Sequence, residues 1–109
     1  MDLDDLKAKL RPDTIMVSVM AVNNEIGTIE PISEIAKIVK ANGNTLFHVD
    51  AIQAYGKIPV NIKDGIDLLS VSGHKFHGPK GLGALWVKNI AKLRPIIYGG
   101  GQEYNLRSG

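Results

Sequence analysis

The sequence contains no cysteine, which excludes both a disulfide framework and a thiolate metal site. Its apolar runs are far shorter than the roughly 20 residues of a membrane-spanning helix. Asp2, Asp4 and Asp5 follow Met1, which is the wrong charge for a signal peptide. The 13 lysines and arginines nearly balance the 11 aspartates and glutamates, and their scatter argues against a nucleic-acid-binding stripe. These absences indicate a cytoplasmic protein that binds neither membrane nor nucleic acid.

The chain of 109 residues is long enough for one domain or for part of one. Asp2 is a suitable N-cap for a short helix that ends near Leu10. A second helix is predicted to begin at Pro31 and to end at Asn42-Gly43. Its buried face follows the helical period with Ile32, Ile35, Ala36 and Val39.

Apolar runs rich in β-branched residues predict strands between and after these helices. The expected strands are 14–21, 45–49, 66–71, 82–87 and a fifth at 95–98. We expect the first strand to be buried on both faces. The order of strand, helix, strand, crossover and strand predicts an α/β fold with a mainly parallel sheet flanked by helices.

Polar side chains gather directly after the predicted strands. These residues are Asn23, Asn24, Asp50, Gln53, Ser72, His74 and Lys75. In open parallel sheets, ligands bind at the carboxyl ends of the strands. The convergence of seven polar residues at such ends therefore predicts a ligand site, and it is a stronger indication than any one of them.

Lys75 stands in a glycine-rich segment, Ser72 to Gly81, directly after the third predicted strand. A lysine attacks an aldehyde only as the neutral amine, and its ordinary pKa is about 10.4. A tight loop that excludes water favours the neutral form and activates the amine. Most lysines are solvated surface residues, and it is the neighbouring polar residues that favour a Schiff-base lysine here.

Asp50 and Gln53 supply an acid and an amide at the end of the second predicted strand. A carboxylate beside the ring nitrogen of pyridoxal phosphate (PLP) stabilises the pyridinium that makes this cofactor an electron sink. Gln53 lies three residues on, so one helical turn brings its amide to the same side. The ordinary alternatives are a helix N-cap for Asp50 and a surface glutamine for Gln53.

Ser72 and His74 flank Gly73, and their hydroxyl and imidazole, together with loop amides, can form a phosphate cradle. An ordinary turn serine and a hydrogen-bonded loop histidine are the alternatives. For His77 we favour a structural role.

Two further polar residues lie in or after strands. Asn23 to Gly27 form a polar cluster after the first strand, and an asparagine there can orient a substrate carboxylate, although Asn and Gly also favour a plain turn. His48 is expected to be a buried, hydrogen-bonded histidine on the strand face away from Asp50.

Two glycine-rich nucleotide-binding motifs are each excluded by one residue. Gly73 and Gly78 have P-loop spacing, but Pro79 stands where the phosphate-binding lysine is needed. Gly81-Leu82-Gly83 begins a dinucleotide fingerprint, but Trp86 takes the place of its third glycine.

Five sequence blocks, in this order, resemble the cysteine desulfurases, which are PLP-dependent enzymes of the class V aminotransferase type. The blocks are Val22–Gly27, His48–Gln53, Ser72–Lys75, Gly78–Gly83 and Gly99–Glu103. The resemblance covers almost the whole chain from Thr14 onward. It implies fold type I, in which a three-layer large domain binds PLP.

The resemblance also implies roles for the residues at the strand ends. Lys75 would carry PLP, Asp50 would pair with the ring nitrogen and Gln53 would bond the phenolic oxygen. Ser72 and His74 would hold the phosphate. Lys75 is thus both the catalytic residue and a cofactor-binding residue.

The implied reaction removes sulfur from L-cysteine and leaves alanine and an enzyme persulfide, which feeds iron–sulfur cluster assembly. By the same resemblance, Asn24 meets the substrate carboxylate. Because the chain has no cysteine, it cannot form the persulfide alone, and we expect it to be inactive in isolation.

We therefore expect residues 1–109 to be the central part of the large domain, with an N-terminal segment and a C-terminal small domain missing. The parent protein is expected to form a homodimer and to deliver sulfur to an acceptor or scaffold protein. Tyr104-Asn105 departs from the basic residue that usually follows Gln102-Glu103 in the family.

Two alternatives to a cysteine desulfurase remain. One is another class V PLP enzyme (a transaminase or a selenocysteine lyase), and the other is a non-catalytic α/β module that associates with itself.

Overall fold

The computed structural model describes residues 1–109 and has four strands and two α-helices. The strands are β1 (Met16–Met20), β2 (Leu46–Asp50), β3 (Leu68–Ser72) and β4 (Gly83–Val87), and the helices are α1 (Leu3–Lys9) and α2 (Ile32–Ala41). Three short 3-10 turns follow β3 and β4: η1 (Gly73–Phe76), η2 (Ile90–Lys92) and η3 (Glu103–Asn105). Neither α-helix has the length and apolarity that a bilayer crossing requires.

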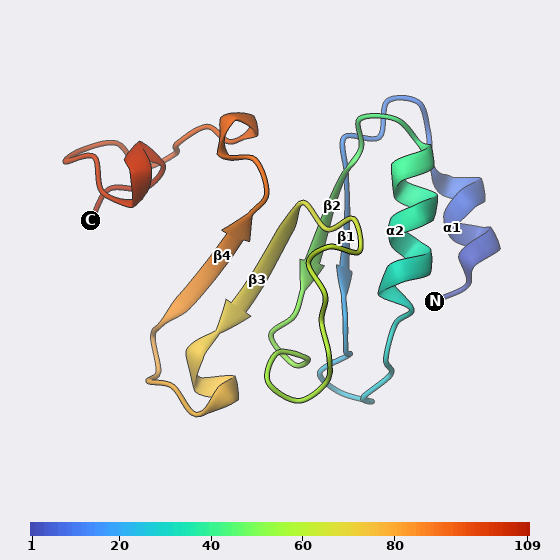
Figure 1. Cartoon of the computed structure of the whole chain (residues 1–109), viewed down its shortest axis with the longest axis horizontal. Helices are drawn as coiled ribbons and strands as arrows, with labels where there is room; N and C mark the ends of the chain where they lie inside the picture. Colours follow the sequence, from blue (N-terminus) through green and yellow to red (C-terminus); the bar gives the residue numbers. More distant parts are fainter.

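The four strands form one sheet in the order β1-β2-β3-β4 (Figure 1). β1, β2 and β3 are parallel, and β4 returns antiparallel beside β3. The connection from β1 to β2 crosses through α2, whereas β3 and β4 are joined by a short hairpin connection that contains η1. The predicted α/β fold with a mainly parallel sheet is confirmed.

Both helices begin and end where the sequence predicts. The side chain of Asp2 caps α1 by accepting hydrogen bonds from the backbone N–H groups of Asp4 and Asp5, at 2.8 and 3.1 Å. α2 follows Pro31 directly, and Asn42 is its C-cap. Gly43 then takes a φ of +80°, the left-handed conformation in which glycine is favoured.

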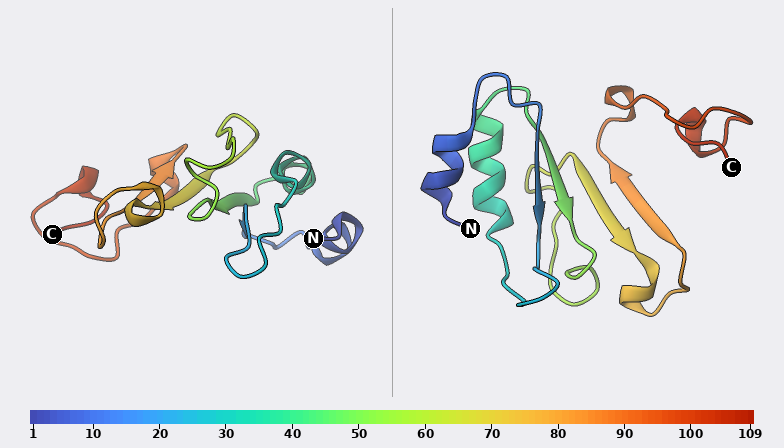
Figure 2. Two further views of the ribbon diagram at one scale, coloured as in Figure 1. Left: turned by 90° about the horizontal axis from the view of Figure 1, so that it is seen from below. Right: turned by 180° about the vertical axis from the view of Figure 1, so that it is seen from behind.

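The core lies between α2 and one face of the sheet. Its five largest fully buried side chains are Phe47, Ile35, Ile66, Val39 and Val49. Figure 2 shows α2 on one side of the sheet, with the segment between β2 and β3 on the same side. The residues of this chain leave the opposite face open: Met16 of β1 is 48% exposed. The expectation that the first strand is buried on both faces is therefore wrong.

The residues after η2 form a C-terminal arm that stands apart from the sheet (Figure 1). The predicted fifth strand at 95–98 does not form, and Ile96 is 91% exposed. An apolar run becomes a strand only beside a partner strand, and none lies next to this one. The arm explains why the radius of gyration is 15.1 Å, against about 13 Å for a compact domain of this length.

Candidate functional site

The carboxyl ends of β1, β2 and β3 meet at one edge of the sheet, at the lower end in Figure 1. The strand register aligns Met20 with Asp50 and Asp50 with Ser70. The loop after β1, the turn after β2 and η1 after β3 all leave from this edge. The structure thus brings the predicted site segments to neighbouring positions.

Lys75 lies in η1 and is half-buried. The turn is closed by two backbone hydrogen bonds of 2.8 Å, from Gly78 N–H to the carbonyl of Gly73 and from Gly73 N–H to the carbonyl of Leu82. His77 ends η1 with a φ of +69°, which agrees with the structural role predicted for it. None of the five ion pairs of the chain involves Lys75. The predicted tight loop is confirmed, and it leaves the Lys75 amine without a carboxylate partner.

Ser72 and His74 are hydrogen-bonded to each other next to Lys75. The Ser72 hydroxyl and the Nδ1 atom of His74 are 2.9 Å apart. His74 is exposed, and its Nε2 atom makes no hydrogen bond within the chain, so this nitrogen can face an anion. The two side chains that the sequence predicts for a phosphate therefore lie together.

Asp50 ends β2 and uses one carboxylate oxygen locally. Its Oδ1 accepts a hydrogen bond from Ile52 N–H at 2.9 Å, so the alternative of a capping aspartate is part of its role. The carboxylate is half-buried, and its second oxygen is not used by that cap. Gln53 is also half-buried, and its Oε1 lies 3.5 Å from the ammonium of Lys57.

The turn after β2 packs against the loop of Lys75. The rings of Tyr55 and Phe76 meet edge to face, with centroids 5.1 Å apart and planes at 65°. Gly56 has a φ of +77°, and a Cβ atom there would lie 3.2 Å from the Cβ of Phe76. This contact couples the segment of Asp50 and Gln53 to the segment of Lys75. Sequence reasoning missed Tyr55, since nothing in the local pattern shows which loop it faces.

Asn23 and Asn24 have different surroundings. The carboxamide oxygen of Asn23 accepts from Glu25 N–H at 2.9 Å and from Ile26 N–H at 3.0 Å. Asn24 is exposed at the tip of the same loop. The turn that sequence analysis offers as an alternative is thus made by Asn23, and the side chain of Asn24 takes no part in it.

His48 lies on the same sheet face as Asp50, so the prediction that it faces away is wrong. Alternate residues of a strand share a face, and 48 and 50 are alternate. The ring is half-buried and bridges two serines: Nδ1 lies 2.7 Å from the hydroxyl of Ser18 and Nε2 lies 3.0 Å from that of Ser70. The expected hydrogen bonding is confirmed. Its partners become visible only once the register of β1, β2 and β3 is known.

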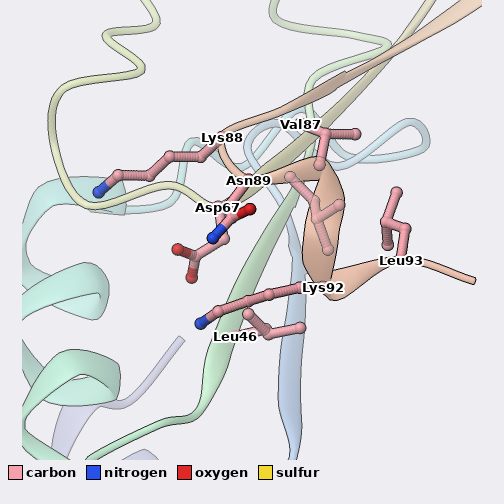
Figure 3. A pocket seen from close by; sticks show the side chains of 8 residues that line it. Leu46, Asp67, Val87, Lys88, Asn89, Lys92 and Leu93 are labelled. Carbon is pink, nitrogen blue, oxygen red and sulfur yellow. The ribbon is translucent and has the colours of Figure 1, made fainter. Parts of the chain in front are cut away.

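The principal cavities of the chain do not include the predicted site residues. None of the five principal cavities is lined by Lys75, Asp50 or Ser72. The cavity in Figure 3, of about 390 Å³, lies at the amino ends of β2 and β3, and Asp67 and Lys88 are among its lining residues. In this chain the candidate site lies open at the carboxyl ends of β1, β2 and β3 and is not enclosed in a cavity.

At the cavity shown in Figure 3, the pKa of Asp67 departs from its ordinary value. Its burial raises the pKa of the carboxyl, but hydrogen bonds from the Lys40 ammonium and the Phe47 N–H outweigh burial and lower the pKa below its ordinary value. The group therefore stays ionised and ties α2 to β2 at the end of the sheet opposite Lys75.

Comparisons with known proteins show which family the chain is similar to. A family model described as aminotransferase class-V matches residues 1–108. The chain is 57% identical over 109 residues to the cysteine desulfurase IscS of Dictyoglomus turgidum, covering 99% of this chain and 27% of that protein. It is 58% identical over 111 residues to the mitochondrial cysteine desulfurase of Candida albicans, covering 99% of this chain and 22% of that protein.

Solved structures show the same fold. A NifS-like protein matches with a TM-score of 0.94 at 49% identity, covering 99% of this chain and 30% of that one. A structure described as SspA in complex with cysteine matches with a TM-score of 0.92 at 41% identity, covering 100% of this chain and 32% of that one. The chain spans about a quarter of the length of the curated relatives it matches. It belongs to the class-V aminotransferase family, whose members use PLP, and within that family it closely matches the cysteine desulfurases.

Proposed function

We propose that residues 1–109 are the central part of the PLP-binding large domain of a cysteine desulfurase, with Lys75 as the residue that carries the cofactor. The observation that supports this most directly is the arrangement around η1. A half-buried lysine without an ion-pair partner lies beside a hydrogen-bonded Ser72–His74 pair. The segment of Asp50 ends the neighbouring strand.

The side chains at the sheet edge fit PLP chemically. The cofactor presents an aldehyde, a phosphate, a phenolic oxygen and a ring nitrogen. The edge offers an amine, a hydroxyl with an imidazole, an amide and a carboxylate, which match these groups in that order. The loop that carries the amine is closely packed at Gly78, where a residue with a side chain would meet backbone atoms. A Cβ atom at Gly78 would lie 2.9 Å from the carbonyl oxygen of Gly73.

When bound, PLP supplies an electron sink for the chemistry of an amino acid. In the proposed site, Lys75 would hold the cofactor through its aldehyde carbon. The Asp50 carboxylate would hold a proton on the ring nitrogen, since an anion beside that nitrogen stabilises the cation. The Gln53 amide would donate to the phenolic oxygen, and the hydrogen-bonded pair of Ser72 and His74 would hold the phosphate.

We propose L-cysteine as the substrate, with Asn24 donating its side-chain N–H groups to the substrate carboxylate. The relatives named above carry the name cysteine desulfurase, and one matching structure is described as a complex with cysteine. The proposed products are alanine and a persulfide. Because this chain has no cysteine, the thiolate that accepts the sulfur must come from another segment of the parent protein, and isolated residues 1–109 are inactive.

The proposed context is a cytoplasmic homodimer that passes sulfur to an acceptor or scaffold protein for iron–sulfur cluster assembly. The C-terminal arm supports self-association, because it presents Ile96, Tyr98 and Tyr104 at 91%, 76% and 84% exposure. These three large side chains would be covered in such a dimer.

Borohydride reduction of the PLP-loaded parent protein tests the assignment. We expect peptide mapping to find the reduced pyridoxyl group on Lys75. Lys75→Ala should abolish the visible absorption band of the bound cofactor. Lys80→Ala should retain it, because Lys80 is an exposed lysine five residues further along the same connection. Label on another lysine would refute the proposal, and failure of the loaded protein to release alanine from L-cysteine would exclude the desulfurase reaction.

A further inference from the structure

The loop between β1 and α2 is held by a compact set of hydrogen bonds. Asn23 N–H donates to the carbonyl of Thr28 at 2.9 Å, and Gly27 N–H donates to the carbonyl of Asn23 at 3.2 Å. Val22 and Ile29 form an isolated antiparallel bridge at its base. The loop is therefore a closed turn whose tip is Asn24 to Gly27.

Asn23 is the centre of this turn. Its backbone N–H, its backbone carbonyl and its side-chain oxygen all bond to other residues of the loop. The side-chain oxygen accepts two hydrogen bonds, from Glu25 N–H at 2.9 Å and from Ile26 N–H at 3.0 Å. An Asx turn of this type fixes the backbone of the residue that it encloses. The enclosed residue is Asn24.

We propose that Asn23 is the positioning residue for Asn24, and that it thereby determines how well the site distinguishes amino acids from amines that lack a carboxylate. The inference rests on the proposed function, in which Asn24 meets the substrate carboxylate. Asn24 is exposed, so its own contacts do not order it. The rigid turn made by Asn23 sets the direction in which its side chain leaves the backbone.

The chemistry of the turn predicts which substitutions are tolerated. Only the acceptor oxygen of Asn23 is used, so a residue with an acceptor at a similar distance should preserve the turn. Asn23→Ser keeps a neutral acceptor, although serine hydroxyls form this turn more weakly. Asn23→Ala removes the acceptor and leaves two backbone N–H groups without their partner.

The test measures binding to the PLP-loaded parent protein through the absorption change of the bound cofactor. Two ligands are compared: L-cysteine, and cysteamine, which lacks the carboxylate and is otherwise the same. The proteins are wild type, Asn23→Ala, Asn23→Ser and Asn24→Ala. Amide hydrogen exchange at Glu25 and Ile26 reports separately whether the turn is intact.

We expect Asn23→Ala to weaken L-cysteine binding roughly tenfold, because it removes two hydrogen bonds that order the loop. Cysteamine binding should be unchanged. Asn24→Ala should show the same selective loss with normal exchange at Glu25 and Ile26, and Asn23→Ser should fall between Asn23→Ala and wild type.

Three outcomes would overturn the inference. If Asn23→Ala weakens both ligands equally, the residue supports the loop generally and does not act on the carboxylate. If Asn24→Ala binds like wild type while Asn23→Ala does not, Asn23 does not act through Asn24. If wild type itself binds both ligands alike, the proposed role of Asn24 fails, and the inference fails with it. If Asn23→Ala does not fold, Asn23→Ser provides the same comparison between L-cysteine and cysteamine binding.

Discussion

The loop that carries Lys75 leaves no room for a side chain at Gly78, so Gly78→Ala is an informative substitution. A Cβ atom there would lie 2.9 Å from the carbonyl oxygen of Gly73 and 3.2 Å from its Cα. These are backbone atoms, which cannot rotate away as a side chain does. Gly78 N–H also donates to the same carbonyl at 2.8 Å. Alanine must therefore push the two arms of the loop apart.

The size of the effect follows from these two contacts. Overpacking costs about 1–3 kcal/mol, and the lost hydrogen bond adds about 1 kcal/mol. We therefore expect Gly78→Ala to destabilise the loop by roughly 2–4 kcal/mol. Gly81→Ala in the same connection is the matched control, because a Cβ atom there meets nothing within 4 Å. Its cost comes only from a φ of +82°, and is about 1–2 kcal/mol.

Asparagine separates the two causes, because it tolerates the left-handed backbone better than alanine does. Gly81→Asn should recover most of the lost stability, whereas Gly78→Asn should not. The assay is the rate of tryptic cleavage after Lys75 and Lys80 in the native parent protein, together with the affinity for PLP. Cleavage of Gly78→Ala no faster than that of Gly81→Ala would refute the steric argument.

Two further predictions concern the part of the sheet remote from Lys75. The pKa of Asp67 is lowered in the folded chain. The contribution of this carboxylate to stability is therefore present above pH 3.8, its ordinary pKa, and is lost as the pH falls through the lowered pKa of the folded state. Asp67→Asn should lower the free energy of unfolding at neutral pH by about 1–3 kcal/mol, with the difference from wild type shrinking in acid; an equal difference at all pH values would contradict this. Thr45 is 2% exposed and donates its hydroxyl to the carbonyl of Thr14 at 2.8 Å. Thr45→Val should therefore cost about 1–2 kcal/mol in urea unfolding at constant m-value, and an unchanged midpoint would show that this bond contributes nothing.

Local signals in the sequence predicted local structure well. The cap at Asp2 and the helix end at Asn42-Gly43 depend on a few adjacent residues, and both are confirmed. The four strands in the sheet lie inside or within one residue of the predicted runs. The seven polar residues predicted to follow strand ends do lie at or just beyond one sheet edge, because strand direction alone fixes which ends meet.

Features that depend on distant partners were harder to predict. The run at 95–98 has strand composition, but no neighbouring strand pairs with it. The bridge from Ser18 through His48 to Ser70 joins three strands, and its members are recognisable only from the register. The contact between Tyr55 and Phe76 likewise joins two loops whose approach is set by the sheet. Propensity and periodicity describe one segment at a time and carry no information about these pairings.

The antiparallel course of β4 has a consequence for the order in which the chain folds. Parallel strands can pair only after a crossover of a dozen or more residues has been organised, whereas a hairpin closes on a microsecond timescale from neighbouring residues. All five residues of β3 pair with all five of β4 across the connection that holds Lys75. The lysine can thus acquire its backbone geometry from local pairing first, and the strand that ends at Asp50 is added afterwards by slower, long-range docking.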